Sequence, residues 1–176
     1  MTVNSSWENI FRRRTKIDAI DKILMQIPIF QDLNNRELNV IKRILHQREY
    51  GKQEGIFNQG DVGLGMYIVV SGKVEITCDP GSHLLAELNE GDFFGELALL
   101  DDAPRSASAK TKSPGTILCF FKPELLDIIK RYPSTGCKIL FRLAWTIGER
   151  LKHTNEQIQS LTCAPPQETK KIDETV

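Results

Sequence analysis

Two oppositely charged side chains, Glu96 and Arg105, lie within the stretch Phe94–Ala109, which is otherwise rich in small and apolar residues. Arg105 carries a planar guanidinium, which can hold a phosphate through two parallel hydrogen bonds in a way that lysine cannot. Glu96 is unsuited to face a phosphate, but its carboxylate can accept hydrogen bonds from the hydroxyl groups of a sugar. Together the two residues predict a site for a sugar phosphate.

The intervening residues predict a backbone that brings both side chains to one ligand. Gly95 tolerates the positive φ or the close approach that a tight turn beside a ligand requires. Leu97 to Leu100 can form one or two turns of helix, and the unpaired N–H groups at a helix start favour an anionic oxygen. Pro104 ends this segment because it restricts the residue before it and cannot extend a helix. Arg105 therefore returns against the start of its own helix.

The order Phe-Gly-Glu, a small apolar stretch, then Pro-Arg and small residues resembles the phosphate-binding cassette of the cyclic nucleotide-binding domain family. The resemblance implies that Glu96 holds the ribose 2′-hydroxyl and that Arg105 holds the cyclic phosphate. Backbone N–H groups around Leu97 and Ala98, and the hydroxyl of Ser106, would complete the phosphate cradle. In members that prefer guanine this hydroxyl can also reach the base, so Ser106 does not settle base choice. The residues alone leave an alternative open, in which Glu96 and Arg105 form an ordinary ion pair.

Composition sets the outer limits. The chain has 176 residues, of which 40% are hydrophobic and 26% charged, which is typical of a globular protein with one buried core. Lys plus Arg and Asp plus Glu number 23 each, so no overall basic field favours nucleic acid or an anionic membrane. No apolar run approaches the ~20 residues of a membrane helix, and the N-terminus lacks a secretory pattern. We expect a cytoplasmic protein without membrane contact.

Neither metal binding nor catalysis is indicated. The four cysteines are scattered without a Cys-x-x-Cys pair, and the three histidines do not cluster with them. The chain has no Gly-x-Ser-x-Gly nucleophile turn and no complete P-loop. We therefore expect no catalytic residue and no metal ligand.

Between His46 and Phe121, short apolar runs alternate with glycines, a pattern typical of an all-β fold. Eight short antiparallel strands favour a jelly roll, with helices before it and a long helix after it. We expect the strands near 47–50, 55–58, 66–71, 73–78, 84–88, 92–94, 106–111 and 116–121.

The flanking sequence predicts four helices. The first runs up to Pro28, with Ser5 and Glu8 at the spacing of a capping box, and the second lies near 35–45. A short helix follows Pro123, and Ser134 or Thr135 can cap a long one. The chain then divides into an N-terminal helix (1–27), a cyclic nucleotide-binding β roll with short helices (28–135), a C-terminal dimer or lid helix (136–161) and a disordered tail (162–176).

The long helix carries residues spaced alternately four and three apart, which are Leu140, Ala144, Ile147, Leu151, Thr154, Ile158 and Leu161. This seam predicts a homodimer through Leu140, Ile147, Leu151 and Ile158. The alternative is that the stripe packs on its own β roll. The stretch 150–158 resembles the dimer helix of the catabolite activator members of the family, which implies that Thr154 and Asn155 meet the base, one from each subunit.

The sequence thus predicts a non-catalytic sensor of a cyclic purine nucleotide, with cyclic AMP favoured over cyclic GMP. The signal would pass through the long helix to an effector protein of unknown identity. Residues 162–176 are too few for a helix-turn-helix domain, so we expect no direct DNA binding. Three alternatives stay open: a scaffold that binds no ligand, a part of a DNA-binding regulator, and a membrane-surface protein that uses its first helix.

Overall fold

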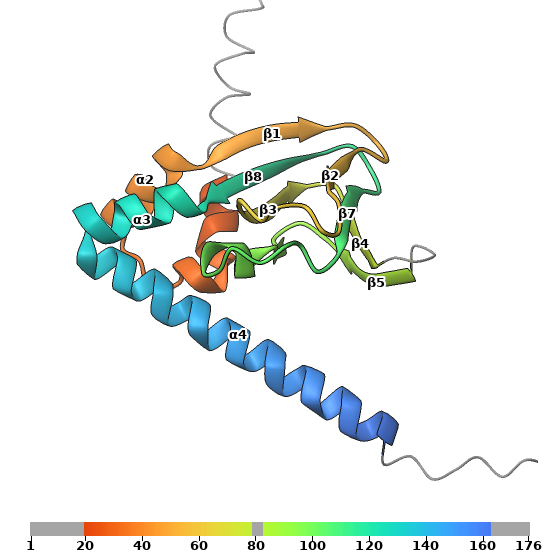
Figure 1. Ribbon diagram of the computed structural model, residues 1–176. Helices are drawn as coiled ribbons and strands as arrows, with labels where there is room; N and C mark the ends of the chain where they lie inside the picture. The colour runs from red at the N-terminus through yellow and green to blue at the C-terminus, as the bar shows by residue number, and fades with distance from the viewer. Residues whose placement is uncertain (1–19, 79–82, 163–176) are drawn as a thin grey trace, which may run out of the picture.

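Two antiparallel four-stranded sheets form the body of the protein (Figure 1), in a computed structural model that describes residues 20–78 and 83–162. The first sheet has the strand order β1-β8-β3-β6, and the second has the order β2-β7-β4-β5. The strands are β1 (His46–Tyr50), β2 (Gly55–Phe57), β3 (Gly65–Ser71), β4 (Val74–Cys78), β5 (His83–Leu88), β6 (Phe93–Phe94), β7 (Ser108–Thr111) and β8 (Gly115–Phe121). All eight predicted strands are present, and the predicted jelly roll with flanking helices is confirmed.

Strands β3 and β8 lie side by side in the first sheet and are buried along almost their whole length. Their sequences are nearly continuous apolar runs because the sheet has helices against one face and the second sheet against the other. The first hydrophobic cluster joins this sheet to the helices through Phe30, Ile41, Phe120 and Ile139. The second cluster fills the space between the two sheets.

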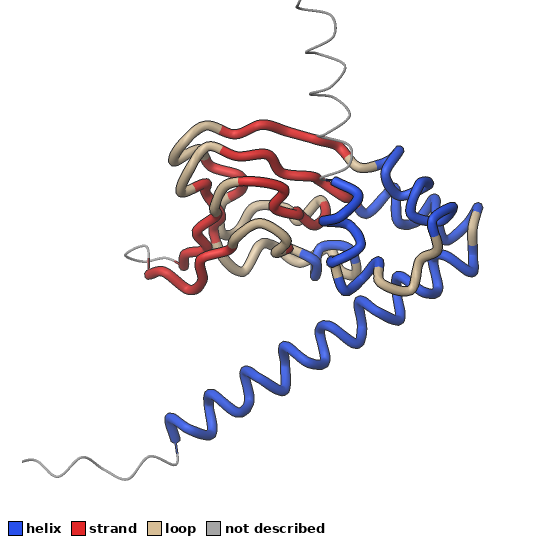
Figure 2. The backbone as a smooth tube through the Cα atoms, turned by 180° about the vertical axis from the view of Figure 1, so that it is seen from behind, coloured by secondary structure: helices blue, strands red, loops and turns tan. Residues whose placement is uncertain are grey.

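Helices gather at one end of the roll (Figure 2). They are η1 (Pro28–Phe30), α2 (Asn35–Ile44), α3 (Lys122–Arg131) and α4 (Pro133–Thr162), preceded by helical residues 20–26. The predicted cap of α2 is confirmed, because Glu37 N donates to Asn34 Oδ1 at 3.0 Å and Asn34 N donates to Glu37 Oε2 at 2.8 Å. The capping box predicted at Ser5 and Glu8 and residues 163–176 of the predicted tail lie outside the described residues, whereas Thr162, the first residue of that predicted tail, is the last residue of α4.

The start of α4 differs from the prediction. This helix begins at Pro133, so Ser134 and Thr135 lie inside its first turn and do not cap it. Proline suits this position because the first turn of a helix does not need its N–H. The Thr135 hydroxyl instead donates to Glu37 Oε1 at 3.2 Å. The threonine therefore ties α4 to α2.

The first half of α4 belongs to the core of the domain. Ile139 and Leu143 are fully buried, and Lys138 Nζ donates to both carboxylate oxygens of Glu37 at 2.8 and 2.9 Å. Arg142 donates two hydrogen bonds, of 2.5 and 2.6 Å, to the carboxylate of Asp32. Apolar contact and charge thus both fix this half.

The second half of α4 has the opposite character. Residues 151–160 are exposed, and Figures 1 and 2 both show the helix leaving the roll toward its C-terminal end. The long axis of α4 therefore carries its last turns away from the rest of the domain. None of the helices within 20–78 and 83–162 combines the length and the apolar character needed to cross a membrane.

Candidate functional site

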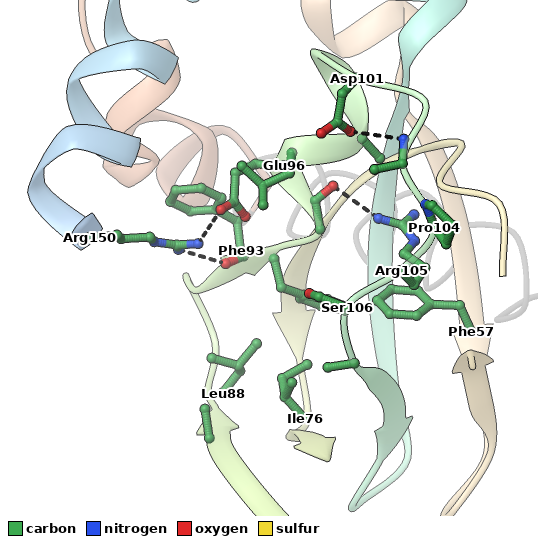
Figure 3. Close-up of a pocket in the computed structure, with 17 residues that line it drawn as sticks. Phe57, Ile76, Leu88, Phe93, Glu96, Asp101, Pro104, Arg105, Ser106 and Arg150 are labelled. Carbon is green, nitrogen blue, oxygen red and sulfur yellow. Dashed lines mark hydrogen bonds and ion pairs between the residues drawn. The ribbon is translucent and has the colours of Figure 1, made fainter. Parts of the chain in front are cut away.

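A pocket of about 440 Å³ lies between the roll and α4 (Figure 3). Its polar lining residues include Glu96, Ser106 and Arg150, with the buried Arg105 at one side. The remaining wall is apolar and comes from β4, β5 and β6, with Ile76, Ala86, Leu88 and Phe93 among its residues. Six predicted site residues line this one pocket: Gly95, Glu96, Leu97, Ala98, Arg105 and Ser106.

The turn at Gly95 has the conformation that its sequence predicted. Its φ is +72°, and a Cβ there would lie 2.6 Å from Arg105 Nη1, so both the backbone and the space require glycine. The following helix is a single 3-10 turn, η2 (Glu96–Leu99), which has the length of the predicted turn from Leu97 to Leu100 but begins one residue earlier. Ala98 N donates to Gly95 O at 3.3 Å, so this backbone donor is used inside the turn.

Arg105 is buried, with only 7% of its surface exposed, and both its backbone and its side chain are held by hydrogen bonds. Its backbone N donates to Asp61 O at 2.8 Å, and its O accepts from Gly60 N at 2.9 Å. Its guanidinium donates from Nη1 to Gly95 O at 3.0 Å and from Nη2 to Gly65 O at 2.7 Å. Nε is buried and has no hydrogen-bond partner. The buried cation therefore keeps an unused donor.

Glu96 is 6% exposed, and its Oε1 accepts a hydrogen bond of 2.7 Å from Arg150 Nη1. Arg150 also donates from Nη2 to Phe93 O at 3.1 Å, and its guanidinium lies 4.6 Å from the centre of the Phe93 ring. The alternative of an ion pair between Glu96 and Arg105 is therefore wrong, because the partner of Glu96 is a residue of α4. Figure 3 shows Arg150 reaching from this helix toward the glutamate.

Sequence reasoning missed Arg150 as a site residue. It lies in α4, far along the chain from Glu96, and no local motif marks it as a partner of this carboxylate. The long-range packing of α4 brings the two together. Only a general rule indicated that Glu96 would have such a partner, because a buried carboxylate needs a positively charged or hydrogen-bonding group.

Thr154 and Asn155 do not line the pocket. Both are exposed on α4, and the Thr154 hydroxyl donates to Arg150 O at 2.9 Å. Within a single chain these residues are therefore separate from Glu96 and Arg105. Their contact with a base bound in a second subunit stays a prediction.

The site combines a buried guanidinium, a buried carboxylate and an apolar wall in one small pocket of a jelly roll. Such a lining suits a small molecule that carries an anionic group, hydroxyl groups and an apolar ring. Residues 47–132 match the family model of the cyclic nucleotide-binding domain, so this part of the chain is a domain of that family.

The chain is similar in sequence to two regulatory proteins. It is 33% identical over 141 residues to the cyclic AMP receptor protein of Thermus thermophilus, and the alignment covers 77% of this chain and 62% of that protein. It is 40% identical over 90 residues to the cAMP-dependent protein kinase regulatory subunit of Mycosarcoma maydis, and the alignment covers 50% of this chain and 17% of that protein. The chain thus spans less than two thirds of the length of either relative.

Solved structures agree on the fold. The catabolite activator protein of Thermus thermophilus aligns with a TM-score of 0.68 at 33% identity, covering 77% of this chain and 63% of that chain. A cyclic nucleotide-binding domain from Methylobacillus flagellatus aligns with a TM-score of 0.73 at 22% identity and covers 85% of both chains. The second likeness bears on the fold alone.

Proposed function

We propose that this protein is a non-catalytic sensor of a cyclic purine nucleotide, with cyclic AMP favoured over cyclic GMP. Arg105 would hold the cyclic phosphate and Glu96 the ribose 2′-hydroxyl, while the apolar wall receives the base. Gly95, Leu97, Ala98 and Ser106 would shape and complete the phosphate end. The observation that carries this proposal is the buried guanidinium of Arg105, which lines the pocket and keeps Nε unpartnered. A phosphate would supply the missing acceptor and the missing negative charge.

The regulatory role is supported by the relatives, which are a receptor protein and a kinase regulatory subunit. The preference for cyclic AMP is likewise inferred from these relatives. The polar groups of the pocket fit recognition, since the arginine donates hydrogen bonds and the glutamate accepts them. Binding without turnover is therefore the simplest role for the site.

Arg150 gives the proposal a route from ligand to helix. A ribose hydroxyl that donates to Glu96 would compete with Arg150 for the same carboxylate. Arg150 belongs to α4, so any change in this ion pair favours a different position of the helix. The output would then reach an effector protein through α4.

We also propose a homodimer, but along a face of α4 that differs from the predicted seam. Leu140 and Ile147 are partly buried against the core of their own chain. The most exposed aromatic residues of α4 are instead Phe141 at 68% and Trp145 at 51%. A stripe with alternating spacings of three and four starts at Phe141 and includes Phe141, Ala144, Gly148, Leu151, Asn155 and Ile158. Such a stripe suits a second copy of the same helix, with Asn155 fixing the register.

The test is calorimetric titration of the purified protein with cyclic AMP and with cyclic GMP. We expect saturable binding of one nucleotide per chain, tighter for cyclic AMP. The variant Arg105→Ala should weaken binding by about a hundredfold or more, since it removes charge-assisted hydrogen bonds in a buried site. Arg131→Ala, at an exposed arginine of α3, is the matched control and should bind as the wild type does.

One other function has an observation in its favour. Glu96 already has Arg150 as a partner, and two donors of Arg105 are already used by backbone carbonyls. A scaffold that binds no ligand would have such internal partners. No heat from either nucleotide, with the protein folded, would favour this scaffold over the sensor.

A further inference from the structure

The charge of Arg105 lies in the interior without a carboxylate beside it. Within residues 20–78 and 83–162, no ion pair includes this guanidinium, and its polar partners are the neutral carbonyls of Gly65 and Gly95 and the neutral phenol of Tyr67. The nearby acid Glu96 is paired with Arg150 instead. A buried charge needs compensation, because desolvation of an unpaired cation is costly. Another group must therefore help to hold the guanidinium in place.

Aromatic rings lie where a counter-charge would be expected. The guanidinium carbon of Arg105 lies 4.2 Å from the centre of the Phe57 ring and 5.4 Å from that of Tyr67. These distances are within the range of a cation–π interaction, which is strongest when the cation is desolvated. Phe57 is the closer ring, and in Figure 3 it lies directly beside the guanidinium.

The backbone of β2 is irregular at the position that carries this ring. Gly55 pairs with Lys110 and Phe57 pairs with Ala109, so one extra residue is accommodated between them. A bulge of this kind changes the direction of a side chain relative to a regular strand. The ring also packs against two other aromatic rings, because its centre lies 5.5 Å from that of Tyr67 and 5.9 Å from that of Phe94. Its place against Arg105 is thus fixed by both the strand and its neighbours.

We infer that Phe57 is the positioning residue of the phosphate site: its ring face holds the Arg105 guanidinium in the interior and keeps it oriented toward the pocket in place of a carboxylate. The absence of a paired carboxylate leaves the positive charge of Arg105 available to an anionic ligand. The inference about orientation concerns this chain alone, whereas its consequence for nucleotide affinity rests on the proposed function.

A double-mutant cycle on folding tests the inference without any ligand. The variants are Phe57→Leu, Arg105→Met and the two combined, and urea unfolding gives the folding equilibrium constant of each. We expect Phe57→Leu to lower this constant about tenfold more in the presence of Arg105 than in the Arg105→Met background, because the lost cation–π interaction needs both partners. Equal effects in the two backgrounds would mean that Phe57 only fills space, and would overturn the inference.

Rescue and ligand binding provide the second readout. Phe57→Tyr keeps the ring face and should keep the coupling to Arg105, while Phe57→Leu should weaken cyclic AMP binding about tenfold. Unchanged affinity in Phe57→Leu would also overturn the inference. If the wild type binds neither cyclic AMP nor cyclic GMP, the proposed function fails, and the folding cycle alone decides the role of Phe57.

Discussion

The phosphate end of the pocket and the second half of α4 are built in opposite ways. At the phosphate end, Glu96 and Arg105 are buried, and each has hydrogen-bond partners from distant parts of the chain. In the second half of α4, residues 151–160 are exposed, and the hydroxyls of Thr154 and Ser160 bond to carbonyls of the helix itself. The proposed recognition of a sugar phosphate would therefore use residues of one chain only. The exposed end of α4 can take part in recognition only if this helix moves or if another molecule docks on it.

The substitution Gly95→Ala should disrupt the phosphate end of the pocket most strongly. The new Cβ would lie 2.6 Å from Arg105 Nη1 at a residue with φ of +72°, so the guanidinium must leave its place. We expect cyclic AMP affinity to fall about a hundredfold, measured by calorimetry, because the charge-assisted contacts need this geometry.

Gly91→Ala is the matched control for this change. Gly91 also has a positive φ, of +88°, but it does not line the pocket, and a Cβ there would meet only Gln26 Oε1, at an ordinary contact distance of 3.6 Å. It should cost about 1 kcal/mol of folding free energy through backbone strain, with little change in affinity. Equal losses of affinity in both variants would show that strain, rather than displacement of Arg105, is responsible.

A second substitution tests the other region of the comparison. Phe141→Glu places a charge in the exposed aromatic part of α4 and should weaken self-association at least tenfold, since large aromatic residues dominate such interfaces. Sedimentation velocity over a range of concentrations measures the effect. Leu126→Glu, at an exposed leucine of α3, should associate as the wild type does. If the wild-type protein is monomeric at every concentration, the proposed dimer is wrong.

The connection between the two regions is tested by Arg150→Met. This change removes the ion pair between α4 and Glu96 but leaves the cassette intact. We expect nucleotide affinity to change only a few-fold, because in the proposed function the ribose hydroxyl competes with Arg150 for Glu96 and does not depend on it. Hydrogen exchange in residues 136–161 should respond to cyclic AMP in the wild type and lose this response in the variant. A response that persists would rule out Arg150 as the connection.

The sequence was sufficient for features that depend on neighbouring residues. The strands were predicted because glycines and short apolar runs alternate locally, and the cap of α2 because Asn34 and Glu37 are three residues apart. The turn at Gly95 was predicted for the same reason. Each of these features is decided within a few residues of the chain.

Features that depend on tertiary docking could not be predicted in this way. The seams that start at Leu140 and at Phe141 share Ala144, Leu151 and Ile158, so the periodicity alone does not choose between them. The docking of α4 against the core decides, because it turns Leu140 inward and leaves Phe141 exposed. The partners of Glu96 and Arg105 likewise come from remote elements.

The smallest predicted effect concerns the contact between Glu37 and Lys138, which helps to anchor the fixed first half of α4. The hydrogen bond from Lys138 lowers the pKa of Glu37 below its usual value of 4.5, and the backbone N–H of Asn34 adds to this. A carboxylate with a lowered pKa in the folded state stabilises the fold above its unfolded pKa, and this stabilisation is lost as the pH falls through the folded value. Stability should therefore decrease on acidification below about pH 4.5.

Glu37→Gln should cost about 1 kcal/mol at pH 7 and flatten this acid dependence, because the amide keeps the shape but not the charge. Urea unfolding between pH 7 and pH 3 measures both changes, and Glu90→Gln, at an exposed glutamate before β6, is the control. The effect should appear as loosening of the first half of α4, since Glu37 contacts this helix through Lys138 and Thr135. If Glu37→Gln left the pH profile unchanged, the charge pair would not be what holds the helix, and the buried contacts of Ile139 and Leu143 would suffice to anchor it.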